Sequence, residues 1–353
     1  MAGLPRVSIT DLADGAAGRP ALDEDGHITV PLVAVQLDED VSQSALERAA
    51  TRAGESGRLL IGVASALPPA RLTPLLDALD CTLALAGDIR QTVAVADPDQ
   101  VAESLNAAAT ANPQASLILG RVLRITPALG VPAALEVESL AYSTLLGGPE
   151  FARWLAGRTA RAAPPRTGDP VLVSRDAAIL RITLNRPERR NAYGRDLRDA
   201  LADALRVARS DPAITRVVLD GAGPCFCSGG DLDEFGTTPD PVTAHFIRTR
   251  AGAAGLLHDL AARTEARVHG PCVGAGVELP AFAGTVVAGE DATFRLPETG
   301  MGLIPGAGGT VSLPRRIGRW RTFYLALSGL PLNAATALAW GLADRVAAGV
   351  PPS

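Results

Sequence analysis

Lysine is the most informative absence in this sequence, because all 33 basic side chains of the 353-residue chain are arginine. Without lysine the chain cannot form a Schiff base with a carbonyl substrate or with pyridoxal phosphate, and it cannot carry a P-loop lysine. We interpret the deficit as codon bias toward Ala, Arg, Gly and Pro. Whatever its origin, the absence of lysine excludes covalent lysine chemistry.

Aromatic residues and long apolar runs are also scarce. Aromatics make up only 4% of the chain, so we expect a core of Ala, Val and Leu, and a hydrophobic content of 47% is typical of a globular protein. No apolar run reaches the roughly 20 residues that span a bilayer, and the N-terminus lacks the pattern of a signal peptide. The net charge of −5 argues against nucleic-acid binding.

Cysteines are few and lack the CxxC spacing of metal or redox sites. The four, Cys81, Cys225, Cys227 and Cys272, favour reduced thiols in a cytosolic protein. No second Cys or His pair completes a zinc site beside Cys225 and Cys227. We therefore expect a cytoplasmic protein that binds no metal and no membrane.

Strand and helix patterns alternate along most of the chain, which predicts an α/β fold with much parallel pairing. We expect an N-terminal tail over 1–28, loosely held, and a first unit over 29–157 that ends in helices. A linker rich in Pro and Arg follows over 158–170, and a second unit covers 171–350. Within the second unit, residues 241–263 are expected to form one long helix. A helix-then-strand pattern recurs in both units and indicates a weak internal repeat.

Four segments of the second unit carry groups suited to catalysis. They are LNRPERRNA (184–192), CFCSGGD (225–231), HGPCVGAGVEL (269–279) and FRLPETGMGLIPGAGGT (294–310). The second and third place glycines directly after predicted strands, where two backbone N–H groups can converge on a developing oxyanion. Glu278 lies in the first turn of a predicted helix and Glu298 follows Pro297. Two carboxylates in apolar, glycine-rich surroundings suit divided acid and base roles.

Together these segments resemble the crotonase (enoyl-CoA hydratase/isomerase) superfamily over about residues 171–346, with four motifs in the family's order. The resemblance implies a crotonase-like ββα spiral with a helical oligomerisation segment. It implies that Gly230 and Ala275 supply the oxyanion-hole amides and that Glu278 and Glu298 are the catalytic carboxylates. Ala275 departs from the family's usual glycine, although its N–H is retained.

The family often places lysine near the CoA phosphates, and this chain has none. Arg189 and Arg190 are the candidate replacements, because a guanidinium binds phosphate through a planar fork. The predicted substrate-binding set is completed by residues of the glycine-rich segments: Cys227, Ser228, Asp231, Gly274 and Leu303. A capping role for Asp231 and core packing for Leu303 are the alternatives.

The function implied by the resemblance is that of an acyl-CoA enzyme, most directly an enoyl-CoA hydratase. It needs no cofactor beyond the coenzyme A of its thioester substrate, and it forms a homotrimer or a dimer of trimers. The alternatives are an enoyl-CoA isomerase, a cofactor-free arylacetyl-CoA dioxygenase and a non-catalytic scaffold of the same fold. The two glutamates argue against the scaffold.

The first unit lacks the FxxGxD-like and PE motifs, so we expect a degenerate, catalytically silent crotonase-like unit. Family members carry a helical tail after the motif GL-x-D-x-V, but here the sequence ends shortly after GLADRV. We expect residues 125–157, which resemble that tail, to serve the second unit in its place.

Overall fold

The computed structural model describes residues 3–18, 22–87, 89–159, 164–165 and 167–348. Parts of the predicted tail (1–28), of the predicted linker (158–170) and of the end of the second unit (171–350) therefore lie outside the described residues. Among the helices that are described, none combines the length and apolar character needed to cross a membrane.

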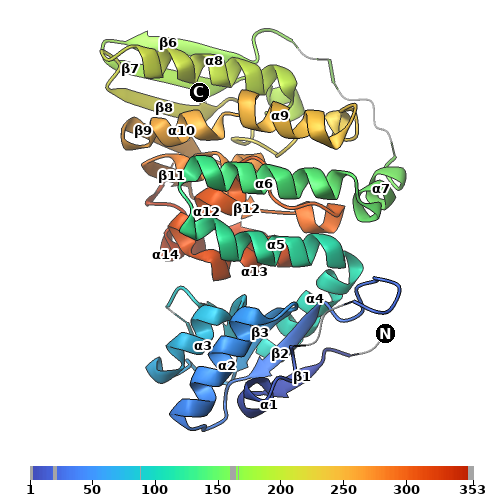
Figure 1. Ribbon diagram of the computed structural model, residues 1–353. Helices are drawn as coiled ribbons and strands as arrows, with labels where there is room; N and C mark the ends of the chain where they lie inside the picture. Colours follow the sequence, from blue (N-terminus) through green and yellow to red (C-terminus); the bar gives the residue numbers. More distant parts are fainter. Residues whose placement is uncertain (1–2, 19–21, 88, 160–163, 166, 349–353) are drawn as a thin grey trace.

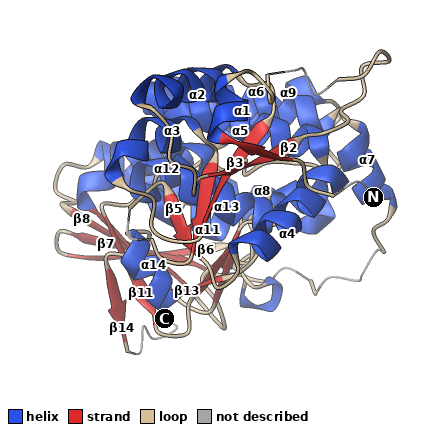
Figure 2. Ribbon diagram, turned by 90° about the horizontal axis from the view of Figure 1, so that it is seen from below, coloured by secondary structure: helices blue, strands red, loops and turns tan. Residues whose placement is uncertain are grey.

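A five-stranded parallel sheet organises the first half, with its strands in chain order. The strands are β1 (Arg6–Ser8), β2 (Leu32–Gln36), β3 (Leu59–Ala64), β4 (Cys81–Ala84) and β5 (Thr92–Ala94). The helices around it are α1 (Ile9–Ala13), α2 (Gln43–Glu55), α3 (Thr73–Ala78) and α4 (Pro98–Ala111). Helices α1 to α3 lie on one face, and α4 lies on the other (Figure 2). All six residues of β3 are buried because both faces are covered.

The N-terminal residues belong to this sheet, so the prediction of a loosely held tail is wrong for residues 6–13. Strand β1 pairs in parallel with β2, and Ser8 caps α1 through a capping box with Asp11. Ile9 and Leu12 are buried in the cluster formed with α2. A strand of only three residues is too short to show the alternation that sequence reasoning needs.

Two further sheets organise the second half. One has six strands in the order β14-β11-β9-β8-β7-β6, and the other has three in the order β10-β12-β13. The strands are β6 (Val171–Asp176), β7 (Ile179–Leu184), β8 (Arg216–Gly221), β9 (Thr264–Val268), β10 (Pro271–Val273), β11 (Thr285–Gly289), β12 (Thr293–Arg295), β13 (Leu332–Asn333) and β14 (Arg345–Ala347). Neighbours in the larger sheet run parallel, except for the β6–β7 hairpin. The α/β class with much parallel pairing is thus confirmed.

The helices of the second half differ from the predictions at two points. They are α8 (Arg195–Ser210), α9 (Pro241–Ala251), α10 (Ala254–Asp259), α11 (Ala275–Glu278), α12 (Gly309–Ile317), α13 (Arg319–Ser328) and α14 (Ala334–Trp340). The single helix predicted over 241–263 is wrong, because the backbone is extended at Gly252, a weak helix former, and separates α9 from α10. Helix α12 was missed because glycines precede it and Pro314 lies inside it.

Three helices of the first half lie against the second half. They are α5 (Pro113–Ile125), α6 (Val131–Leu146) and α7 (Pro149–Ala156). Figure 1 shows α6, in green, between α9 and α12, and α5 beside α13. Helix α13 of the second half packs on β4 and β5 of the first sheet. The two halves therefore share one hydrophobic core.

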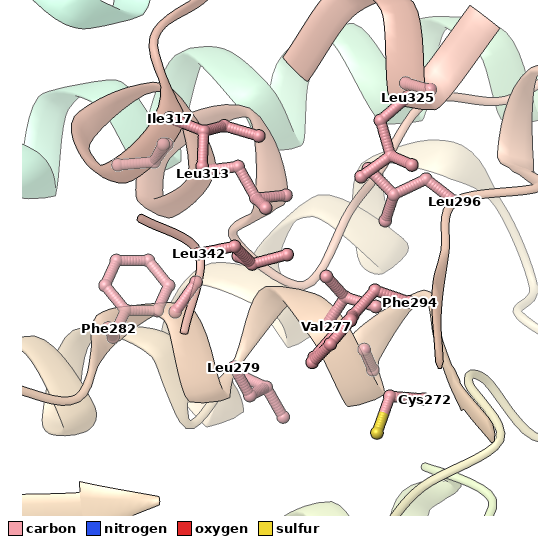
Figure 3. Close-up of a cluster of buried hydrophobic side chains, with 14 of the residues drawn as sticks. Cys272, Val277, Leu279, Phe282, Phe294, Leu296, Leu313, Ile317, Leu325 and Leu342 are labelled. Atoms are coloured by element: carbon pink, nitrogen blue, oxygen red, sulfur yellow. The ribbon is translucent and has the colours of Figure 1, made fainter. Parts of the chain in front are cut away.

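The part of the core beneath α11 fixes the direction of that short helix. Val277 and Leu279 are buried, and Figure 3 shows Val277 beside Phe294 of β12. Leu313 and Ile317 of α12 belong to the same cluster. Since the residues on both sides of position 278 point into the core, the side chain between them is turned toward another surface of the helix.

Candidate active site

A cavity of about 630 Å³ is lined by residues of both halves of the chain. Its wall comes from α6, both ends of α8, residues 230–239, α9 and α10, and the segments around α11 and α12. Gly230, Ala275, Glu278 and Glu298 all line it. The structure thus brings together the two predicted amides and the two predicted carboxylates, which come from three separate segments of the sequence.

The two glycine-rich turns lie side by side at the cavity wall. The Val273 N–H donates to the Cys227 carbonyl at 3.1 Å, and Gly274 has a φ of +49° that favours glycine. Neither the Gly230 nor the Ala275 N–H donates a hydrogen bond to any acceptor in the described part of the chain. Two free amides on adjoining turns of a cavity wall can stabilise an oxyanion.

Glu278 is fixed by the amino-terminal turn of α12. Its Oε2 accepts hydrogen bonds from the N–H groups of Ala307 at 2.7 Å and Gly309 at 2.8 Å, and its side chain is buried. The amides at a helix start have no partner within the helix, so a carboxylate there satisfies them and meets the positive end of the helix dipole. One oxygen of Glu278 is therefore held in place.

Glu298 follows Pro297 in a short 3₁₀ turn, η7 (Glu298–Met301), after β12. Its Oε2 is buried and has no hydrogen-bond partner among the described residues. A Cβ placed on Gly274 would lie 2.6 Å from Oε1 of Glu298 and 3.8 Å from Oε1 of Glu278. Both carboxylates therefore meet at Gly274, and one oxygen of Glu298 is left for a group that enters the cavity.

A third carboxylate, that of Glu138, reaches the cavity from α6 of the first half. Its Oε1 accepts from the Gly308 N–H at 2.7 Å, and its Oε2 accepts from the N–H and hydroxyl of Thr310 at 2.8 and 2.7 Å. Tyr142, one turn further along α6, also lines the cavity and packs its ring against Gly306.

Burial raises the pKa of all three carboxyls. The pKa of Glu298 rises to about 8 and that of Glu138 to about 7, and that of Glu278 lies well above its usual value. The charge of Glu298 raises the pKa of Glu278 further, and the charge of Glu138 raises the pKa of both Glu278 and Glu298. The amides of α12 act in the opposite direction on Glu138 and Glu278. Like charges in a water-poor cavity cannot all be ionised, so the cluster retains protons near neutral pH.

Arg189, predicted to bind the CoA phosphates, does not line the cavity. Its guanidinium donates to both oxygens of Asp231, at 2.8 and 2.9 Å, and to Asp233 at 2.7 Å. Asp231 also accepts from the Asp233 N–H and caps a 3₁₀ turn. Arg189 and Asp231 therefore form an ion pair with each other. This pairing counts against the phosphate-binding role of Arg189 and favours the capping role of Asp231.

Other members of the predicted substrate-binding set have supporting positions. Leu303 is fully buried in the core, and its N–H donates to the Glu298 carbonyl, so it supports η7 rather than lining the acyl pocket. Cys227 is buried beneath the first glycine-rich turn. Ser228 donates its N–H to the carbonyl of Arg190, whose side chain is exposed outside the cavity lining. Gly274 lies directly against both carboxylates.

Arg189 and Arg190 do not line the cavity, but other arginines do. They are Arg195, Arg198, Arg206 and Arg209 on α8 and Arg248 and Arg250 on α9. Arg195 and Arg250 are exposed, and neither forms an ion pair with a described residue. Among the described side chains, no group of three His, Cys, Asp or Glu has the geometry to hold a metal ion.

Glu138 and Tyr142 were not identified from the sequence, because the first half was expected to be silent. One signal was available. Glu138 lies in a strongly apolar helix between buried positions such as Ala134 and Leu145. A carboxylate at a buried helical position must have hydrogen-bond partners elsewhere in the fold, and here they lie 170 and 172 residues away.

The parallel sheet, the paired free amides and the two carboxylates define an acyl-transfer or enolate-forming class of enzyme. Residues 174–350 match the sequence model of the enoyl-CoA hydratase/isomerase family. The chain belongs to this family, the crotonase superfamily, and has an enoyl-CoA hydratase/isomerase function. The match begins at residue 174, so the first half of the chain lies outside it.

Individual proteins are similar to about half of the chain. The chain is 37% identical over 176 residues to the 2,3-dehydroadipyl-CoA hydratase of Escherichia coli, covering 50% of this chain and 68% of the relative. It is 35% identical over 180 residues to the enoyl-CoA isomerase/hydratase fer4 of Mycosarcoma maydis, covering 48% of this chain and 66% of the relative. A solved enoyl-CoA hydratase of Mycobacterium smegmatis is 32% identical, with a TM-score of 0.47, over 51% of this chain and 70% of that one.

Proposed function

We propose that the protein is an enoyl-CoA hydratase, which adds water across the 2,3 double bond of an enoyl-CoA thioester. The thioester carbonyl oxygen lies between the N–H groups of Gly230 and Ala275, which stabilise the charge of the enolate as it develops. The observation that carries the proposal is the meeting of Glu278 and Glu298 at Gly274, beside Ala275 on the cavity wall.

Hydrogen bonding supports a division of roles between the two carboxylates. Burial raises the pKa of both carboxyls, so the division of roles rests on their hydrogen bonds. Glu278 accepts two backbone amides, which favour its charged form, so it acts as the base that removes a proton from the attacking water. Glu298 has a buried oxygen without a donor, which favours its protonated form. The hydroxide adds to C3, and Glu298 delivers its proton to C2. The reverse sequence dehydrates a 3-hydroxyacyl-CoA.

The arginines at the cavity support binding of the CoA phosphates. Arg195 and Arg250 present exposed guanidinium groups without carboxylate partners among the described residues. A guanidinium can bind phosphate through two parallel hydrogen bonds, so lysine is not required. We assign the phosphates to these side chains instead of Arg189 and Arg190.

The remaining parts of the proposal concern the whole assembly. The parallel sheet of the first half, with strands in chain order, supports its origin as a degenerate crotonase-like unit without the catalytic motifs. The contacts of α5 and α6 with α12 support a role for these helices as the displaced helical tail. We propose a cytoplasmic homotrimer or dimer of trimers, to be tested by analytical ultracentrifugation.

The experiment that tests the reaction type is a screen of acyl-CoA thioesters by mass. Hydration adds about 18 Da, isomerisation leaves the mass unchanged, and dioxygenation adds about 32 Da. We expect the hydration mass with a 2-enoyl-CoA such as crotonyl-CoA. An unchanged mass with a displaced double bond would assign the isomerase, a chemistry that one carboxylate can perform, and CoA binding without any product would assign the scaffold.

A further inference from the structure

Glu138 has no part in the proposed hydration, although its carboxylate lines the same cavity. We infer that Glu138 is a positioning residue of the active site: it fixes the amino-terminal turn of α12 together with Glu278 and sets the charge of the carboxylate cluster. The first half of the chain thereby supplies part of the machinery that the second half uses. This inference rests on the proposed function.

The geometry at the start of α12 links the two glutamates directly. Four consecutive N–H groups, from Ala307 to Thr310, are shared alternately between two carboxylates. Glu278 accepts the first and third, and Glu138 accepts the second and fourth. These amides belong to the residues that precede and begin α12, and they are satisfied by side chains that lie 29 to 172 residues away. A shift of this turn would move Glu278 as well.

A purely structural role would not place the carboxylate in the cavity. Glu150 is the comparison within this chain, because it is 4% exposed and accepts the N–H groups of Gln114 and Ala115 at the start of α5, at 2.7 and 2.9 Å. Glu150 lies outside the cavity lining, whereas Glu138 lies in it together with Glu278 and Glu298. The two glutamates satisfy helix starts in the same way and differ in whether they face the reacting groups.

The charges around Glu138 determine how it acts on its neighbours. The titratable and charged groups on the surrounding elements are Tyr142, His245, Arg248, Glu278, Glu298 and Arg315. Arg248 bonds to Ser139 and Ser143, with its guanidinium 4.5 Å from the centre of the Tyr142 ring, and forms no ion pair with Glu138 among the described residues. His245 pairs with Glu136, and Arg315 bonds to backbone carbonyls.

Glu138 forms no ion pair among the described residues, and its charge acts on the two catalytic carboxyls as well as on Tyr142 and Arg248. That charge raises the pKa of both Glu278 and Glu298. Removing it should lower the pKa of the group that must be ionised to act as a base. The acid limb of the rate profile should therefore move to lower pH, an effect that loss of a helix cap alone would not produce.

The test compares Glu138→Gln with Glu150→Gln. We expect Glu138→Gln to lower kcat about tenfold and to move the acid-limb midpoint of kcat/KM for crotonyl-CoA down by about one pH unit. Glu150→Gln should lower thermal stability and keep the midpoint of the unchanged protein. Equal midpoints in Glu138→Gln and the unchanged protein would overturn the inference and leave hydration itself intact.

A readout independent of turnover separates failure of this inference from failure of the proposed function. Infrared difference titration follows the carbonyl stretch of protonated carboxyls directly. We expect Glu138→Gln to lose one buried carboxyl and to shift those that remain to lower pH, even if no acyl-CoA is converted. Should Glu138→Gln fold poorly, Thr310→Val keeps all four amides and removes only the hydroxyl donor, and it should raise the midpoint of Glu138. Unmoved bands in both variants would contradict the inference.

Discussion

Gly274→Ala tests how tightly the two carboxylates are placed. Gly274 has φ +49° and ψ −118°, a conformation that costs a residue with a side chain about 1–3 kcal/mol. The added Cβ would lie 2.6 Å from Oε1 of Glu298, whereas an ordinary carbon–oxygen contact is about 3.4 Å. Glu298 must therefore move by roughly 0.8 Å, and a misplacement of about 1 Å in a catalytic group can cost a hundredfold in rate.

The assay is kcat for crotonyl-CoA hydration, with thermal unfolding measured in parallel. Gly300→Ala is the matched control, since Gly300 lies in the same turn as Glu298 and its Cβ would meet no atom within 4 Å. We expect Gly274→Ala to lower kcat by about two orders of magnitude and Gly300→Ala to change it less than about twofold. A rate for Gly274→Ala close to that of the unchanged protein would refute the placement of Glu298 described above.

The remaining predictions concern stability and substrate binding. In the unfolded chain the carboxyl of Glu138 titrates near its ordinary value of 4.5, and in the folded protein near 7, so the unfolded chain loses this proton first as the pH rises. The contribution of Glu138 to the free energy of unfolding should therefore fall by about 2.5 kcal/mol from pH 5 to 8, and Glu138→Gln should lose this part of the pH dependence in urea unfolding. The same pH dependence in Glu138→Gln and in the unchanged protein would contradict the prediction. Arg124→Ala should lower the free energy of unfolding by about 3–5 kcal/mol. The guanidinium of Arg124 donates to both oxygens of the buried Asp80 carboxylate, at 2.6 and 2.8 Å, and the substitution leaves that carboxylate without this partner. Arg71→Ala, which breaks an exposed pair, should cost less than about 1 kcal/mol in the same unfolding assay. Arg195→Ala should raise KM for crotonyl-CoA about tenfold with little change in kcat, whereas an unchanged KM would exclude a phosphate contact.

Elements with strong local signals could be predicted from the sequence. Strand β3 appears as an apolar run because both of its faces are buried, and α4 begins with Asp97, whose side chain accepts the Gln100 N–H. Glu278 and Glu298 could be identified for the same reason, since each lies in a short motif at the end of a strand. Each of these signals is local, and the two glutamates also needed the four motifs in their order along the chain.

The misassigned residues depend on contacts between distant segments. The predicted role of Arg189 was chosen from its neighbours in sequence, but its guanidinium is bound by Asp231 and Asp233, 42 and 44 residues further along. Glu138 was missed because its partners at the start of α12 are about 170 residues away. No periodicity or motif links such positions, so only the packing of α6 on α12 reveals them.

The measurement that tests the central claim most directly is the mass and rate of product formed from crotonyl-CoA by the unchanged protein, by Glu278→Gln, by Glu298→Gln and by the double variant. We predict a product heavier by about 18 Da and a loss of about 10² to 10⁴ in kcat for each single variant, with the double variant little slower than the worse single one. Hydration that continues at the original rate in the double variant would contradict the two-carboxylate account.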